Sequence, residues 1–258
     1  MATASRKPLI LIVNDDGITS EGLVALARAA RRLGRVFVVA PDRQRSATSL
    51  ALTLHGPLRV KRLHPAWYSV DGTPADCVYL AVCKILPRLP DLLLSGVNRG
   101  PNLGRQDVAY SGTVAAAIQG TFIGIPSLAA SQLPDDNGRF EYDEAASLAV
   151  RIGGHLLRGA ALPGITLSCN VPPSPVKGIR LARLGERRYA PEIIERKDSR
   201  RNSVFRIGTG NSRTVGGSGT DLEAIRLGYA SLTPLHTDLT EYKALRFRRL
   251  REIAKIRT

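Results

Sequence analysis

Short apolar runs alternate with segments of helical periodicity through the first two thirds of the chain, and this alternation limits the possible folds most. The runs lie at residues 9–13, 36–40, 91–95, 125–130 and 165–170. Each is short and largely apolar, as expected of a strand that is buried on both faces of a sheet. Because such strands need a helix between them to run parallel, the pattern predicts an α/β protein.

Helix start signals stand between these runs. Thr19 or Ser20 can cap a helix with Leu23 and Leu26 on its apolar face. Residues 73–76 (TPAD) combine a cap, a proline in the first turn and an acid three residues after the cap. This second helix is predicted to run to about residue 86, and further helices are predicted at residues 111–119 and 142–157. We therefore predict a Rossmann-like, doubly wound, mostly parallel sheet in a three-layer α/β/α fold, with ligands at the carboxyl ends of the strands.

The pattern changes after residue 171, where Pro172, Pro173 and Pro175 interrupt it. Residues 180–214 are basic and weakly periodic, which suggests hairpins, and residues 238–257 have helical spacing. We therefore divide the chain into a catalytic core, residues 1–172, and a C-terminal extension, residues 173–258, that folds onto it.

Charge and composition narrow the function classes. The 258 residues carry a net charge of +15. Residues 180–258 hold 18 Lys and Arg against 9 Asp and Glu, whereas residues 1–179 hold 19 against 13. A basic balance attracts anionic partners such as phosphorylated metabolites, polyphosphate or nucleic acid, although a solvated Arg-rich surface has the same composition.

No apolar run is long enough for a signal peptide or a membrane span, and the three cysteines match no zinc or redox motif, so we expect a cytoplasmic protein without a membrane partner.

Polar side chains follow three of the predicted strands at the edge where such strands end. Asp15 and Asp16 follow the first strand, Ser46 comes shortly after the second, and Asn98 follows the third. Their donor atoms are all oxygen, which favours Mg²⁺ or Mn²⁺, with Ca²⁺ possible in crystals. Adjacent carboxylates also need a compensating cation. The sequence thus predicts one divalent metal per subunit, although an Asp-Asp-Gly after a strand is often only a turn.

A candidate phosphate site lies next to these loops. A helix that opens with Ser111, Gly112 and Thr113 presents free backbone N–H groups and the positive end of its dipole to an anion. Ordinary capping by Ser111 is the alternative interpretation. Asn14 and Asn102, in the loops alongside, are further candidate substrate contacts.

The sequence lacks the motifs of several other nucleotide-binding, hydrolase and metal-binding proteins. The Gly-rich loop at residues 96–104 has neither the lysine of a Walker loop nor the spacing of a dinucleotide fingerprint. There is no Gly-x-Ser-x-Gly elbow of a serine hydrolase, and the Asp-Asp-Gly turn at residues 15–17 lacks the alternating acids of haloacid-dehalogenase phosphatases. The four histidines lack metal-ligand spacing.

The motifs together resemble the SurE family of survival-protein 5′/3′-nucleotidases. The matching segments cover nearly the whole chain: ILIVNDDG at 10–17, VAPDRQRSATS at 39–49, GTPADCV at 72–78, DLLLSGVNRGPNLG at 91–104, DVAYSGTVAAA at 107–117, TD at 220–221 and LTPLHTDLT at 232–240. The resemblance implies a Rossmann-like core, a metal held by Asp15, Asp16, Ser46 and Asn98, and C-terminal segments exchanged within homodimers or homotetramers. It weakens at residues 186–210, where the chain has DSRRNSVFR in place of the family's Asp-Pro-Arg-Gly and aromatic residues.

The sequence therefore predicts a metal-dependent 5′-nucleotidase that hydrolyses nucleoside monophosphates, including 3′-monophosphates. Asp15 or Asp16 is expected to orient or deprotonate an attacking water, with attack by an aspartate itself the less favoured variant. One alternative is a phosphatase of short polyphosphate or another small phosphate ester, which the basic C-terminal part would suit. Another is a nucleotide- or RNA-binding protein without catalysis, although aromatic residues are only 5% and no base-stacking motif is present, so nucleic acid is not expected as the main partner.

Overall fold

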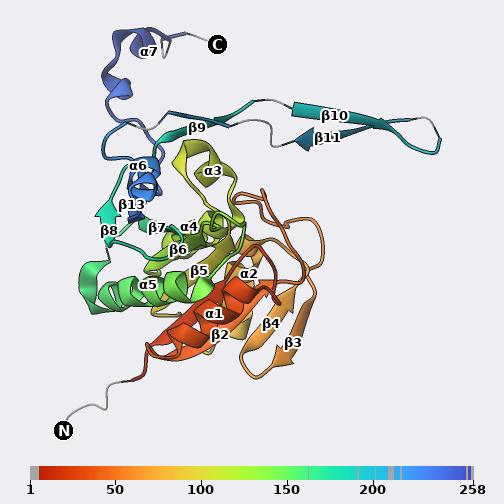
Figure 1. Cartoon of the computed structure of the whole chain (residues 1–258), viewed down its shortest axis with the longest axis vertical. Coiled ribbons are helices and arrows are strands. Elements are labelled where there is room, and N and C mark those ends of the chain that lie inside the picture. Colours follow the sequence, from red (N-terminus) through yellow and green to blue (C-terminus); the bar gives the residue numbers. More distant parts are fainter. Residues whose placement is uncertain are drawn as a thin grey trace.

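The central sheet contains nine strands in the part of the chain that the structure describes. The computed structural model describes residues 6–161, 163–190, 192–200, 202–208, 212–215, 217–253 and 255–256. The strands of the central sheet are β1 (Leu9–Val13), β2 (Arg35–Pro41), β3 (Val60–His64), β4 (Trp67–Val70), β5 (Leu92–Arg99), β6 (Ser127–Gln132), β7 (Ile165–Val171), β8 (Ile179–Leu181) and β13 (Ala230–His236). Their spatial order is β3-β4-β2-β1-β5-β6-β7-β13-β8 (Figure 1).

Strand direction confirms the predicted fold class. In the central sheet, β4, β2, β1, β5, β6 and β7 pair in parallel, whereas β3 pairs antiparallel with β4 and β13 pairs antiparallel with β7. The sequence analysis did not predict β3, β4 or β13. It also placed the fourth strand at residues 125–130, whereas β6 begins at Ser127.

Helices cover both faces of the sheet. They are α1 (Glu21–Ala30), α2 (Pro74–Leu80), α3 (Gly104–Tyr110), α4 (Gly112–Phe122), α5 (Tyr142–His155), α6 (Asp221–Arg226) and α7 (Arg248–Ile253). Single turns at Ala81–Ile85 and Leu156–Ala160 continue α2 and α5, and a short 3₁₀ turn spans Ala244–Arg246. The α1 and α5 helices pack on one face, and α2 and α4 pack on the other (Figure 1).

Two of the predicted caps are present. The Oγ of Ser20 accepts a hydrogen bond from the Leu23 N–H and begins α1. Thr73 and Asp76 form a reciprocal capping box at the start of α2. Each cap satisfies backbone donors that the first turn of a helix leaves free.

The apolar character of β1 follows from its place between the two helical layers. Ile10 and Ile12 belong to the core under α1 and α5, whereas Leu9, Leu11 and Val13 belong to the core under α2 and α4. Burying each of these side chains contributes about 1.5–3 kcal/mol before entropy is counted. The strand is therefore apolar throughout and fixes the position of the loop that follows it.

The C-terminal part of the chain both rejoins the sheet and leaves the body of the molecule. The β13 strand pairs with β7, and β8 pairs with β13. Two ribbons lie in the region where hairpins were predicted: β9 (Glu186–Tyr189) with β12 (Ser212–Val215), and β10 (Glu192–Lys197) with β11 (Ser203–Gly208). The β10–β11 ribbon projects from the body (Figure 1). Residues 191, 201, 209 and 210 of the divergent stretch lie outside the described residues.

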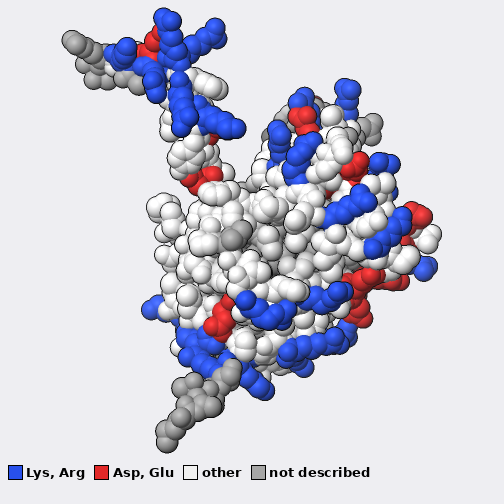
Figure 2. Space-filling view, turned by 90° about the vertical axis from the view of Figure 1, so that its left-hand side faces the viewer, with Lys and Arg blue, Asp and Glu red and all other residues white. Residues whose placement is uncertain are grey.

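The terminal segment is helical over less of its length than predicted. The prediction covered residues 238–257, of which 254 and 257 lie outside the described residues. Helix is limited to Ala244–Arg246 and α7. Figure 2 shows this segment standing away from the body, with Lys and Arg over much of its surface. None of the described helices is long and apolar enough to cross a bilayer.

Candidate active site

The candidate site lies where the winding of the sheet reverses. The β1 strand has β2 on one side and β5 on the other. The chain passes from β1 through α1 on one face, and later reaches β5 through α2 on the other face. Loops at the carboxyl ends of such strands diverge and leave a crevice between them. Residues 14–17, 42–46 and 100–103 form these loops after β1, β2 and β5, and Asn98 and Arg99 are the last two residues of β5.

Asp15 is buried at the end of β1, with 5% of its surface exposed. Its Oδ1 accepts a short hydrogen bond from the hydroxyl of Thr113. The same hydroxyl lies 3.3 Å from the Oδ1 of Asn98. The backbone N–H of Arg45 donates to the Asp15 carbonyl at 2.7 Å, which ties the Ser46 loop to the Asp15 loop. The structure thus brings together the ends of β1, β2, β5 and the start of α4.

The other three predicted metal ligands are less buried than Asp15: Asp16 and Asn98 are half-buried, and Ser46 is exposed. Asp16 is half-buried, and its Oδ2 accepts from the backbone N–H of Arg99 at 2.9 Å. The amide nitrogen of Asn98 donates to the Gly100 carbonyl at 2.8 Å, which leaves its Oδ1 facing Thr113. The exposed Ser46 hydroxyl accepts from the side chain of Gln44 at 2.8 Å.

Both aspartates have raised pKa values in the metal-free protein. Burial raises the pKa of Asp15 to about 6, the Thr113 hydrogen bond opposes this shift, and the charge of Asp16 adds to it. Burial also raises the pKa of Asp16, against the opposing hydrogen bond from the Arg99 backbone. Two neighbouring carboxylates that lose water therefore favour a bound cation over two free charges.

The donor set fits a hard divalent cation. Among the described residues, neither aspartate lies within ion-pair distance of a Lys, Arg or His nitrogen. That part of the chain also contains no group of three His, Cys, Asp or Glu side chains able to hold a metal. A metal at the switch point would therefore have Asp15, Asp16 and neutral oxygens as protein ligands, as Mg²⁺ and Mn²⁺ accept.

The first turn of α4 points at Asp15. Ser111 caps the helix through a hydrogen bond from the Val114 N–H to its Oγ, 3.1 Å long. Gly112 lies so close that an added Cβ would be 2.8 Å from the Asp15 Cβ and 3.0 Å from its Oδ2. Only glycine allows this approach. The helix dipole and the N–H groups of this turn therefore face the same space as the carboxylates.

The two asparagines predicted as substrate contacts are held inside the loops. The amide nitrogen of Asn14 donates to the Gly17 carbonyl at 3.1 Å and to the Ser20 hydroxyl at 2.7 Å. The amide nitrogen of Asn102 donates to the Ser131 hydroxyl at 2.8 Å. These bonds shape the loops after β1 and β5, and direct contact of either asparagine with substrate stays a prediction.

The sequence analysis missed one buried anchor of the site. Asp221 is fully buried, and its two oxygens accept from the Gly104 N–H at 2.7 Å and the Gly185 N–H at 2.8 Å. It thus holds the end of the loop after β5 against the C-terminal part of the chain. Asp221 lies in the first turn of α6, directly after its cap Thr220, and this local position gives no sign of the long-range contact.

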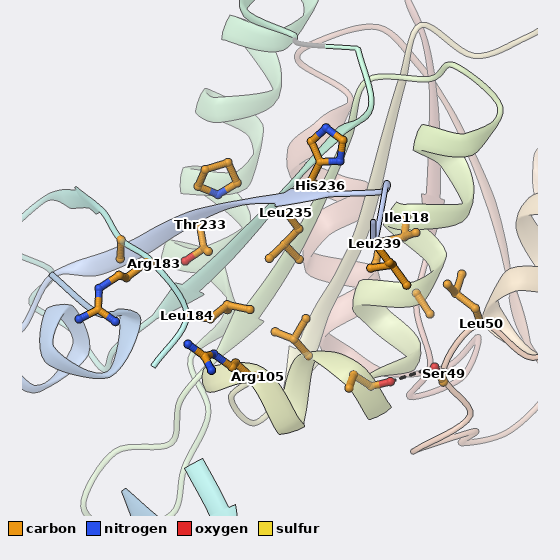
Figure 3. Close-up of a pocket in the computed structure, with 15 residues that line it drawn as sticks. Ser49, Leu50, Arg105, Ile118, Arg183, Leu184, Thr233, Leu235, His236 and Leu239 are labelled. Atoms are coloured by element: carbon orange, nitrogen blue, oxygen red, sulfur yellow. Dashed lines mark hydrogen bonds between the residues drawn. The ribbon is translucent and has the colours of Figure 1, made fainter. Parts of the chain in front are cut away.

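Two cavities flank the switch-point loops. One, of about 440 Å³, is lined by Asp16, Gln44, Arg99, Phe140 and Tyr142 among others. The other, of about 690 Å³, lies where α3, α4 and β13 meet and is lined largely by apolar side chains (Figure 3). Arg105, Arg183 and His236 are the charged or titratable groups in its lining, which contains no carboxylate. Of the candidate catalytic groups, Asp16 lines the smaller cavity.

The fold is a three-layer α/β architecture, with two neighbouring aspartates and the start of α4 together at its switch point. The sequence profile of the family described as survival protein SurE matches residues 10–191. This chain belongs to the SurE family.

Relatives of the chain cover nearly its whole length. It is 44% identical over 236 residues to a protein of Syntrophotalea carbinolica named 5′-nucleotidase SurE, which covers 92% of this chain and 94% of that protein. A protein of Coxiella burnetii with the same name is 43% identical over 245 residues, and the match covers 94% of this chain and 94% of that protein. The crystal structure of the SurE protein from Aquifex aeolicus matches 95% of this chain and all of that chain, with a TM-score of 0.81 and 40% sequence identity.

Proposed function

We propose that this protein is a metal-dependent 5′-nucleotidase that releases phosphate from nucleoside 5′-monophosphates and also accepts 3′-monophosphates. The observation that carries the proposal is the pair of neighbouring aspartates at the switch point, with Thr113 and Asn98 around Asp15. The names of the relatives from Syntrophotalea carbinolica and Coxiella burnetii support the same activity.

Asp15, Asp16, Ser46 and Asn98 are the proposed metal ligands. A divalent cation bound there would polarise a phosphoryl oxygen and lower the pKa of a bound water. The raised pKa of Asp15 supports this assignment, because the carboxylate gains most from a compensating charge. Mg²⁺ and Mn²⁺ are the proposed ions, since the ligands are all oxygen.

The protein's own groups have two further proposed roles. The start of α4, at Ser111, Gly112 and Thr113, would bind the substrate phosphate through backbone N–H groups and the helix dipole. Asp15 or Asp16 would orient or deprotonate the water that attacks phosphorus, in line with the leaving ribose oxygen. The Thr113 hydroxyl would hold Asp15 in its charged form.

The test is phosphate release from AMP by the purified full-length protein, with EDTA and with added Mn²⁺. We expect release that requires the metal and falls by at least a thousandfold in Asp16→Asn. Glu195→Gln, which removes an exposed carboxylate of the β10–β11 ribbon, is the matched control and should keep wild-type activity. Release that persists in EDTA would contradict the metal assignment, and release from tripolyphosphate but not from AMP would favour the polyphosphatase alternative.

A homo-oligomer is the proposed assembly. The terminal segment carries apolar side chains on a projecting part of the chain: Leu239 is 93% exposed and Phe247 is 61% exposed. Exposed apolar side chains on a projecting segment favour burial against another molecule. Light scattering of wild type and Leu250→Glu would test this, with a monomeric variant as the expected result. We also propose the cytoplasm as the compartment, since Cys77, Cys83 and Cys169 are all unpaired.

A further inference from the structure

The smaller cavity places an aromatic stack directly beside the candidate catalytic carboxylates. The rings of Phe140 and Tyr142 are nearly parallel, with centroids 5.9 Å apart and an angle of 9° between their planes. The guanidinium of Arg99 lies over the Phe140 ring, 5.3 Å from its centroid. All three side chains line the same cavity as Asp16.

The local backbone explains why the two rings lie together. Phe140 and Tyr142 are two residues apart in the segment that enters α5, and Glu141 between them is extended, with φ of −115° and ψ of 92°. Side chains at positions i and i+2 of an extended segment lie on the same side. Phe140 is half-buried, so part of its ring stays open to the cavity.

Arg99 joins this stack to the reacting groups. Its backbone N–H donates to the Oδ2 of Asp16 at 2.9 Å, while its side chain reaches over Phe140. A ligand in the cavity therefore contacts flat π and guanidinium surfaces on one side and lies next to Asp16 on another. A polyphosphate has no flat group that could contact the aromatic rings. A nucleoside monophosphate has a base that suits the rings and a phosphate that suits the side of the cavity at Asp16.

We propose that Arg99, Phe140 and Tyr142 form the subsite that binds the base of the nucleotide substrate. The proposal rests on the proposed nucleotidase function and names its specificity-determining residues. Nucleobases stack on aromatic rings and on Arg guanidinium planes whatever their identity. A cavity of about 440 Å³ is within the usual size of small-ligand sites. Glu21 and Gln44 in the same lining offer hydrogen-bonding groups for the edge of the base.

The test compares a substrate that has a base with one that lacks it. The quantity is kcat/KM for AMP divided by kcat/KM for ribose 5-phosphate, measured with Mn²⁺ on full-length protein. We expect the ratio to fall about tenfold in Phe140→Leu, because base–aromatic stacking is lost. Phe140→Tyr should keep the ratio. Phe122→Leu, at a ring that is 57% exposed at the end of α4, should keep it as well.

Arg99→Ala is a second variant, and it leaves the Phe140 side chain itself unchanged. It removes the guanidinium but keeps the backbone N–H that bonds Asp16, so the ratio should also fall. An unchanged ratio in Phe140→Leu and Arg99→Ala, or a wild-type protein with equal kcat/KM on both substrates, would overturn the subsite.

Titration with adenosine separates this inference from the proposed function. If wild type releases phosphate from neither substrate, the nucleotidase proposal fails, and calorimetry with adenosine still decides the subsite. Binding to wild type that weakens about tenfold in Phe140→Leu would support it. The absence of adenosine binding to wild type would overturn it.

Discussion

The hydroxyl of Thr113 donates a hydrogen bond to the carboxylate of Asp15 across 98 residues of sequence. This bond joins the first turn of α4 to the end of β1, the two elements that supply the proposed phosphate and metal sites. It also opposes the rise in the Asp15 pKa that burial causes. The helix start and the carboxylate therefore act as one unit, because loss of the Thr113 hydroxyl would raise the pKa of Asp15 further.

Thr113→Val tests this unit, because valine keeps the shape of threonine and removes only the hydroxyl. A hydrogen bond to a charged group is worth about 1.5–3 kcal/mol. We therefore expect kcat/KM for AMP to fall by roughly ten- to a hundredfold, while Thr113→Ser keeps most of the activity.

The matched control for Thr113→Val is Thr121→Val at the other end of α4. The Thr121 hydroxyl lies 2.6 Å from the Thr166 hydroxyl and is distant from Asp15. It should lower the melting temperature and keep kcat/KM. A Thr113→Val enzyme with wild-type kinetics would show that the hydroxyl does not matter to the reaction.

The raised pKa of Asp15 predicts an unusual pH dependence of the free energy of unfolding for the metal-free protein. Its pKa rises from 3.8 to about 6 on folding, so the folded state favours the protonated form. The contribution of Asp15 to stability is therefore fully present below pH 4 and is lost as the pH rises through 6. The size of this loss is on the order of 2–3 kcal/mol.

Asp15→Asn isolates that contribution. In EDTA, the variant and wild type should unfold with similar free energies at pH 4, whereas at pH 7.5 the variant should be more stable. Urea unfolding at both pH values measures this difference. If the free energies of unfolding of variant and wild type differ by the same amount at both pH values, the raised pKa of Asp15 is contradicted. Added Mn²⁺ should stabilise wild type and leave Asp15→Asn nearly unchanged.

The sequence was sufficient to predict those parts of the fold that depend on local patterns. The β1 run is apolar because both of its faces are buried, and the Ser20 and Thr73 caps are local signals that the structure confirms. The β13 strand could not be predicted in the same way. Its alternating pattern follows from its place between β7 and β8, which no local signal indicates.

The same distinction between local patterns and long-range contacts applies to the candidate site. Asp15 and Asn98 could be grouped from the sequence, because the ends of parallel strands share an edge. The contacts of Asp221 with Gly104 and of Arg99 with Phe140 could not, because they join segments that only the complete fold brings together. The amide of Asn14 bonds to its own loop and that of Asn102 bonds to Ser131 in β6, and their contact with substrate stays a prediction.

Gly112→Ala should impair the reaction more than it impairs folding. The added Cβ would lie 2.8 Å from the Asp15 Cβ and 3.1 Å from the Pro74 Cγ, so Asp15 or the helix must move. A displacement of this kind at a reacting group costs about a hundredfold in rate. Alanine is otherwise the better helix former.

Gly154→Ala is the control for Gly112→Ala. A Cβ at Gly154 in α5 would meet its nearest neighbours at 3.5 Å, an ordinary contact. This variant should keep kcat/KM and gain up to about 1 kcal/mol of stability. If Gly112→Ala turns over AMP at the wild-type rate, the close approach of α4 to Asp15 has no role in catalysis.

Asp221→Asn tests whether the C-terminal part of the chain holds the loop after β5. The buried carboxylate accepts from the Gly104, Gly185 and Leu222 N–H groups at 2.7, 2.8 and 2.9 Å. An amide would present its own N–H groups to one of these donors, so the free energy of unfolding should fall by about 2–3 kcal/mol.

Because Gly104 follows the loop that begins after Asn98 and Arg99, Asp221→Asn should also raise the Mn²⁺ concentration needed for half-maximal activity. Glu223→Gln on the same helix, whose carboxylate accepts from the Gly219 N–H at 2.7 Å near the surface, should change neither quantity. Loss of stability without a change in the Mn²⁺ requirement would limit Asp221 to a structural role. Loss of both would mean that the segment after residue 173 helps to set the geometry of the metal site.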